Sequence, residues 1–192
     1  GEILLLDGAT GTELDRRGCD VSLPLWSGKA LLDAPEEIVD LGHLLHEMRL
    51  FKSRGELSAM RRAGRISAEA QKRAMRACRP GLNEAQIHAE LVHEYMSHQC
   101  EPAYPPIVGG GANACVLHYI DNNQPLEDGD LLLIDAGCEY DGYASDITRT
   151  FPVNGRFNGE QRALYEVVLA AQEQAIDAVR EGAQWDDLHD VA

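Results

Sequence analysis

The stretch "LLLIDAGCEYDGYASDITRT", residues 131–150, holds two aspartates, Asp135 and Asp146, with ten residues between them. Asp135 ends an apolar run, and Asp146 stands among small and β-branched residues. Runs of this composition are typical of strands that pack against a core. The stretch therefore predicts a β-hairpin, and it raises the question of why two carboxylates stand where the pattern indicates core residues.

The turn of the hairpin sets how the two aspartates face each other. Asp141-Gly142 is a strong two-residue turn signal, since both central positions of a type I′ turn need a positive φ. That turn places Asp135 opposite Thr148 and diagonal to Asp146, whereas a turn that begins one residue earlier places the two aspartates directly opposite. Because side chains alternate along a strand, both registers put the two carboxylates on one face.

Two carboxylates on one face need a neutralising partner. Like charges that face each other across a ladder are destabilising, and an unpaired, partly buried carboxylate costs free energy. One or two divalent cations would neutralise Asp135 and Asp146, and oxygen ligands suit hard metals such as Mn²⁺ or Mg²⁺. The alternative is two hairpin aspartates in solvent, one of them near Arg149. Spacing alone favours this alternative without excluding the metal site.

The composition narrows the classes of partner and compartment. Of the 192 residues, 17 are basic and 32 acidic, and the formal net charge of −15 argues against nucleic acid as a partner. No apolar run approaches the roughly 20 residues of a membrane helix, so no membrane is expected, and the N-terminus lacks the pattern of a signal peptide. Five cysteines at wide spacings, without a C-x-x-C, favour reduced thiols in a cytoplasmic protein.

The order of predicted elements indicates an α+β fold whose sheet is built from hairpins rather than βαβ crossovers. Pro80 and Gly81 separate two helices, and Asn83 with Gln86 forms a capping-box-like start for the second of them. The expected helices cover residues 29–40, about 56–78, about 83–98 and 158–182, and the expected strands cover 2–6, 130–137 and 142–153.

Four segments together carry a resemblance to a known family. They are "HEMRLFKS", "IVGGGANACVLHY", "DGDLLLIDAGCEYDGYASDITRTFPVNG" and "RALYEVVL". Over about residues 43–192 the chain closely resembles the Xaa-Pro aminopeptidase (aminopeptidase P) family of metallopeptidases. The resemblance implies the first half of a pita-bread catalytic domain. It also implies peptide substrates with proline at the second position, from which the N-terminal residue is released.

The same resemblance implies a site. The family binds two metal ions, usually Mn²⁺, through five protein ligands, and the first two of these match Asp135 and Asp146. His118, in "VLHY", matches the family's histidine near the scissile peptide, which helps to bind substrate and stabilise the transition state. We therefore predict Asp135 and Asp146 as metal ligands and His118 as a catalytic and substrate-binding residue, and we leave a homo-oligomer open.

The other three ligands of the family have no match in this sequence. In the family they are one histidine and two glutamates that follow the hairpin at a distance. No glutamate follows Glu181 here, and His189 lies too close to the hairpin to match. The family's N-terminal domain has no match either. We therefore expect the chain by itself to bind metal weakly and to be inactive unless a partner or continuation completes it.

Residues 1–42 resemble a different family. "ILLLDGATGTELDRRGCDVSLPLWSGKALLDAPEEI" is similar to the start of homocysteine S-methyltransferases, in which the aspartate that matches Asp7 lies in the homocysteine pocket. A (β/α)₈ barrel needs about 250 residues, so the segment would be only a short βα fragment of a TIM-barrel start. The sequence thus predicts a chimera of residues 1–42 and 43–192, with homocysteine methyl transfer as an alternative function.

Other motifs have structural explanations. In "HEYMSH" the two histidines, His93 and His98, are five residues apart, one too many for the zinc motif H-E-x-x-H, and should face different ways on a helix. "GGGANA", residues 109–114, lacks the spacing of a phosphate loop and predicts a tight turn that lines a cleft. Cys138 is expected to be a small core residue, and the Met and Leu side chains between 56 and 99 are expected to form helix core.

Overall fold

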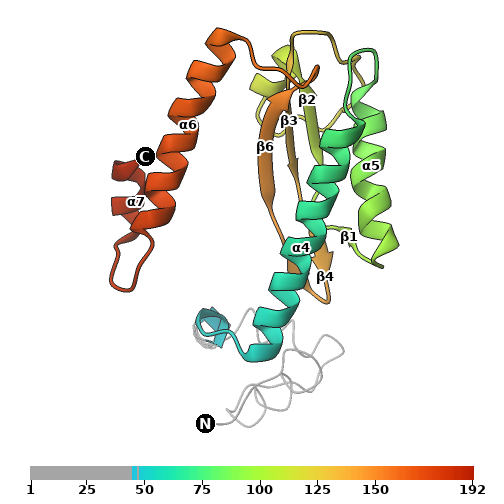
Figure 1. The fold of residues 1–192 in the computed structure, drawn as a ribbon. Coiled ribbons are helices and arrows are strands. Elements are labelled where there is room, and N and C mark those ends of the chain that lie inside the picture. Colours follow the sequence, from blue (N-terminus) through green and yellow to red (C-terminus); the bar gives the residue numbers. More distant parts are fainter. Residues whose placement is uncertain (1–44, 47) are drawn as a thin grey trace, which may run out of the picture. The chain divides into compact units, whose positions relative to one another are not determined.

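The structure is a computed structural model that describes residues 45–46 and 48–192 (Figure 1). The chain divides into two compact units, residues 1–57 and 58–192, and the second unit contains the fold that carries the candidate site. The methyltransferase-like segment predicted for residues 1–42, with Asp7 and the expected domain boundary, lies outside the described residues.

Helix α4, Arg54–Ala77, confirms the long helix expected over about residues 56–78. Its buried face is made mainly of small side chains. The buried residues are Ala59, Ala63, Ile66, Ser67, Ala70, Gln71 and Ala74. Small side chains allow the helix backbone to pack close to its neighbours, because little volume stands between the two.

The prediction that Met and Leu side chains form the core of this region is wrong for most of them. Leu91 is fully buried, but four other side chains are exposed, namely Leu57, Met60, Met75 and Met96. The inward positions of α4 are taken mainly by alanines, with Ile66 as the one large apolar side chain among its buried residues. Leu57, Met60 and Met75 of α4 lie outside this buried set.

Helix α5, Glu84–Ser97, begins at the predicted capping box. The Asn83 backbone N–H donates to the Gln86 Oε1 at 2.8 Å, and the Asn83 side chain accepts in return from the first turn of the helix. The inward face of α5 buries Ile87, Leu91 and Tyr95. The capping signal thus placed the start of this helix correctly from the sequence.

Within the described residues the strands form two small antiparallel sheets, each of three strands, in the orders β2-β3-β6 and β1-β4-β5. The strands are β1 (Glu101–Pro102), β2 (Ile107–Gly110), β3 (Leu131–Ala136), β4 (Cys138–Tyr140), β5 (Tyr143–Ala144) and β6 (Ile147–Pro152). Every pair of neighbouring strands is antiparallel. The predicted α+β architecture with hairpin connections is therefore confirmed.

Strand β3 decides which face of the sheet carries the core. Its residues Leu132, Ile134 and Ala136 are fully buried and belong to one hydrophobic cluster with side chains of α4 and α5. Figure 1 shows these two helices running beside each other along the strands. Because side chains alternate, Leu133 and Asp135 point to the face away from the two helices.

The hairpin between β3 and β6 turns at Asp141–Gly142, as predicted. The two turn residues have φ angles of 53° and 79°, the positive values that a type I′ turn requires. Tyr140 pairs with Tyr143, and Asp135 pairs with Thr148. The first of the two predicted registers is therefore confirmed, and the register with directly opposed aspartates is not the one that forms.

Gly137 lies at the point where the chain bends from β3 into β4. A Cβ at this position would lie 1.6 Å from the carbonyl oxygen of Ser145 on the facing strand. The Gly137 carbonyl also accepts a hydrogen bond of 2.9 Å from the Ala103 N–H. Only glycine permits so close an approach of two backbones. The approach keeps Asp146, the residue after Ser145, next to the end of β3.

Two helices follow the hairpin. Helix α6, Gly159–Ala178, starts at the capping box of Asn158 and Gln161. It ends earlier than predicted, since Val179 leaves the helical conformation, and Gly182 instead adopts a φ of +85° in the turn before α7, Trp185–Val191. No residue of α6 or α7 is buried. Among the described residues, no helix is both long and apolar enough to cross a membrane.

We predict that Gly137→Ala destabilises the fold by about 3 kcal/mol, because the new methyl group forces two packed backbones apart. Gly159→Ala is the matched control, since a Cβ there meets no atom within 4 Å. Urea denaturation of the two variants and of the unchanged chain measures the difference. Equal midpoints for the two variants would show that the close approach at Gly137 is not required.

Candidate functional site

The two predicted metal ligands lie together on the face of the sheet away from the helices. Asp135 is the last residue but one of β3 and is partly buried, whereas Asp146 directly precedes β6 and is exposed. The hydroxyl of Tyr104 lies between them, 2.6 Å from the Asp135 Oδ1 and 2.9 Å from the Asp146 Oδ1. The two carboxylates are therefore bridged by a single hydroxyl group.

This bridge leaves the site short of positive charge. A phenolic hydroxyl carries one proton, so it can donate fully to only one of the two carboxylates at a time. Burial, together with the hydrogen bonds to Asp135 and Asp146, holds the pKa of Tyr104 above its usual value of 10.0. Two carboxylate oxygens that converge on one point, with one proton between them, fit a divalent cation as a further partner.

Tyr104 is a site residue that the sequence did not predict. It stands in "AYPPIVGG", in the segment between β1 and β2, and lies 31 and 42 residues before the aspartates that it contacts. Its only local signal is the pair of prolines that follows it, which restricts the backbone of the segment. No spacing rule connects a tyrosine to carboxylates so distant along the chain, and only the folded sheet brings them together.

His118 lies in the turn that follows the short 3₁₀ helix η1, Gly111–Cys115. Its side chain is exposed, and its backbone is in the left-handed region with a φ of 55°. No hydrogen bond or ion pair among residues 45–46 and 48–192 joins His118 to Asp135 or Asp146. The structure thus brings together the two predicted metal ligands and places the predicted catalytic histidine on a separate loop.

The described part of the chain does not complete a metal site. Within residues 45–46 and 48–192, no group of three or more His, Cys, Asp or Glu side chains could hold a metal ion. Asp135 and Asp146 fit a cation by the chemistry of their oxygens and by their convergence on Tyr104. The described residues thus contribute these two carboxylates as candidate ligands.

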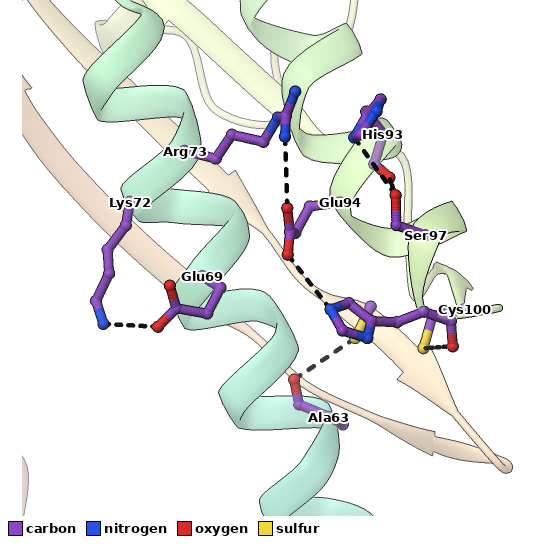
Figure 2. A network of polar contacts seen from close by, with 10 residues as sticks. Ala63, Glu69, Lys72, Arg73, His93, Glu94, Ser97 and Cys100 are labelled. Carbon is purple, nitrogen blue, oxygen red and sulfur yellow. Dashed lines mark hydrogen bonds and ion pairs between the residues drawn. The ribbon is translucent and has the colours of Figure 1, made fainter.

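The two histidines of "HEYMSH" do not form a site, as predicted. His93 and Ser97 contact each other on the outer surface of α5, with 3.5 Å between the Nδ1 and Oγ atoms. His98 instead faces Glu94, with 3.3 Å between Nε2 and Oε1. Figure 2 shows Glu94 facing Arg73 of α4, whose Nη1 is 3.8 Å from a Glu94 oxygen. These contacts tie α4 to α5.

Two other predictions of structural roles have clear outcomes. Cys138 is fully buried in the hydrophobic cluster, as predicted, and its Sγ donates to the Ala63 carbonyl at 3.5 Å (Figure 2). The segment 109–114 is not the tight turn that was predicted. Its first two glycines end β2, and Gly111 begins η1. A short 3₁₀ helix, rather than a tight turn, redirects the chain at this point.

Solved structures identify the class of protein. Aminopeptidase PepP of Pseudomonas aeruginosa matches with a TM-score of 0.77 and 53% identity, over 79% of this chain and 34% of that one. Zn-substituted Escherichia coli aminopeptidase P in complex with product matches with a TM-score of 0.70 and 53% identity, over 71% of this chain and 31% of that one. The fold is therefore part of a pita-bread catalytic domain, the fold of aminopeptidase P.

The sequence comparison then gives the family. The model of metallopeptidase family M24 matches residues 58–192, and the chain belongs to this family, whose enzymes use divalent metal ions. The Xaa-Pro aminopeptidase of Escherichia coli (strain K12) is 51% identical over 152 residues, which make up 79% of this chain and 34% of the relative. The chain thus spans about a third of the length of these relatives.

We predict that Tyr104→Phe lowers the free energy of unfolding by about 1 kcal/mol at neutral pH. The change removes the one hydroxyl shared by two carboxylates, and the partial exposure of the site keeps the cost modest. Urea denaturation measures it against Tyr165→Phe, a control on α6 whose ring packs against Phe157. A loss no greater than that of the control would contradict the bridging role of Tyr104.

Proposed function

We propose that this chain supplies part of the active site of an Xaa-Pro aminopeptidase, which releases an N-terminal residue that precedes proline. The observation that carries the proposal is the pair of Asp135 and Asp146 on the hairpin, bridged by Tyr104. The pair lies in a segment that is about half identical to proteins named Xaa-Pro aminopeptidase. Family membership and local geometry thus support the same activity.

In this proposal Asp135 and Asp146 hold two divalent ions, for which we propose Mn²⁺. Carboxylate oxygens are the ligands that Mn²⁺ prefers, and the charge left unbalanced at Tyr104 favours a cation at this place. Ions bound there supply Lewis acidity toward the scissile carbonyl. The two aspartates bind and orient the ions, and Tyr104 holds the two carboxylates at a fixed separation. Further ligands would complete the site from outside the described residues.

The peptide substrate contacts His118 in this proposal. An exposed imidazole on a loop can donate a hydrogen bond to a peptide carbonyl and stabilise charge that develops there in the transition state. Its exposure and its unusual backbone conformation agree with a residue held for contact with a ligand. His118 then acts on the substrate, while Asp135 and Asp146 act on the metal.

We also propose a cytoplasmic location and contact with further protein. The four cysteines in the described part of the chain are free thiols, namely Cys78, Cys100, Cys115 and Cys138, which suits a reducing compartment. Helix α6 exposes large apolar side chains, namely Leu164, Val167, Val168 and Ile176. Such a face favours association, with the rest of the enzyme or with another copy.

We predict that the 192-residue chain by itself binds Mn²⁺ with a Kd on the order of 0.1–1 mM, because two carboxylates provide few ligands. Electron paramagnetic resonance of free Mn²⁺ measures the binding. Asp135→Asn and Asp146→Asn should each abolish it. Asp141→Asn is the matched control on the same hairpin and should leave it unchanged, since Asn-Gly supports the same turn. Stoichiometric binding of two ions at micromolar concentration would contradict a site of two ligands.

We predict that the chain gains activity when it is continued in frame by the part of the Escherichia coli relative that follows the matched segment. The fused protein should cleave Arg-Pro-Pro after its first residue when Mn²⁺ is present, and should leave Arg-Ala-Ala intact. Asp135→Asn should lower kcat/KM at least about a hundredfold, as loss of a metal ligand does. His118→Ala should lower it by about 10²-fold.

The same hairpin control applies to the fused protein. Asp141→Asn should retain the activity, because the turn keeps its geometry. An unchanged rate for Asp135→Asn would refute the proposed metal role. Cleavage of Arg-Ala-Ala at the rate of Arg-Pro-Pro would refute the specificity for proline, while leaving the metal role intact.

A further inference from the structure

Glu84 is a carboxylate in the core with an unusual set of partners. It is the first residue of α5, and its side chain is fully buried. Burial of a charged group is costly unless every lone pair finds a donor. Four hydrogen bonds meet this requirement, and all four donors are neutral groups. Burial opposes ionisation, but these bonds outweigh it and hold the pKa of Glu84 below its usual value of 4.5.

The donors come from both sides of His118 along the chain. On the side before it, the Gly110 N–H and the Asn113 Nδ2 donate to the Glu84 Oε1 at 2.9 and 3.1 Å. On the side after it, the Tyr119 hydroxyl and the Gln124 N–H donate to the Oε2 at 2.7 and 2.9 Å. One carboxylate is therefore hydrogen-bonded on both sides of His118 to a single loop, residues 111–124, and to Gly110, which directly precedes it.

The two arms are also joined directly. The Asn113 Nδ2 donates to the Tyr119 hydroxyl at 3.1 Å, which closes a small network around the Glu84 carboxylate. Tyr119 is the residue next to His118, so the network ends one peptide bond from the proposed substrate-binding histidine. The backbone of Glu84 also holds the end of the loop, since its N–H donates to the Gln124 carbonyl at 2.9 Å.

The loop has little apolar packing to hold it otherwise. Three large apolar side chains beside His118 are turned outward, namely Val116, Leu117 and Ile120, which are 54%, 86% and 56% exposed. His118 itself has a left-handed backbone, a conformation that costs free energy for a residue with a side chain. Such a conformation persists only where the surrounding structure enforces it. Asn122 holds the far end of the loop through its bonds to Val108 and Pro106, whereas the bonds to Glu84 include the residue next to His118.

We infer that Glu84 is a positioning residue for His118, acting through the hydrogen bonds that fix the loop on both sides of that histidine. This inference rests on the proposed role of His118 in binding the substrate. Glu84 itself is buried in the core, and its four side-chain hydrogen bonds involve neither His118 nor the two aspartates. Its contribution is to hold the loop in one conformation before the substrate arrives, which lowers the entropy lost on binding.

The inference is tested first in the 192-residue chain by hydrogen exchange. In Glu84→Gln an amide group replaces one acceptor oxygen, and because each oxygen accepts from one backbone N–H, that of Gly110 or of Gln124, one of these two donors is left unpaired. Exchange should speed up about ten- to a hundredfold within residues 111–124, while β3 and β6 keep their protection. The matched control is Glu90→Gln on the same helix, which removes only the surface ion pair with Arg73.

A milder variant covers the case in which Glu84→Gln does not fold. Tyr119→Phe removes one of the four hydrogen bonds and keeps the ring, so the core is undisturbed. It should also speed up exchange in residues 111–124, and the imidazole signals of His118 should shift in the NMR spectrum. Unchanged exchange and an unchanged His118 signal in Tyr119→Phe would overturn the inference.

Turnover by the fused protein separates positioning from general stability. Glu84→Gln should lower kcat/KM about tenfold, and the same change in a His118→Ala background should add no further loss. An equal loss in both backgrounds would overturn the inference, because Glu84 would then act independently of His118. An inactive His118→Ala with a fully active Glu84→Gln would overturn it as well. Full activity of His118→Ala would instead refute the proposed role of His118, and the positioning role with it.

Discussion

The alternation of side chains along β3 is the constraint on which the rest of the structure depends. Leu132, Ile134 and Ala136 are buried against α4 and α5, so Leu133 and Asp135 must face the other way. A slip of one residue would turn the carboxylate into the core and the aliphatic side chains out to solvent. The hydrophobic effect that packs the helices on one face thus also orients the candidate metal site on the other.

The structure deals with its carboxylates in two contrasting ways. Glu84 is fully buried, but four neutral donors satisfy it, so it needs no counter-ion and serves as an anchor. Asp135 and Asp146 share one hydroxyl group, so their acceptor capacity is far from satisfied. The pair that shares one hydroxyl is the candidate site for a cation, and the carboxylate with four donors holds backbone in place.

The packing of α4 on the strands and the bend of the hairpin both depend on residues with a small side chain or none. The inward face of α4 is lined mainly by alanines, which allow a long helix to pack closely against the strands. Gly137 likewise allows the two arms of the hairpin to approach each other at the bend that precedes Asp146. The site therefore depends on positions where a side chain is small or missing, and a search for large apolar residues overlooks them.

Local patterns by themselves determined several elements in the part of the chain that the structure describes. The Asp141–Gly142 turn, the capping boxes of α5 and α6 and the alternation of β3 depend on neighbours within a few residues, so the sequence predicted them correctly. It also predicted that both aspartates share a face. Only the tertiary structure decided that Tyr104 joins them and that α4 packs through alanines, because these contacts depend on how closely distant segments approach each other, and no local pattern encodes that distance.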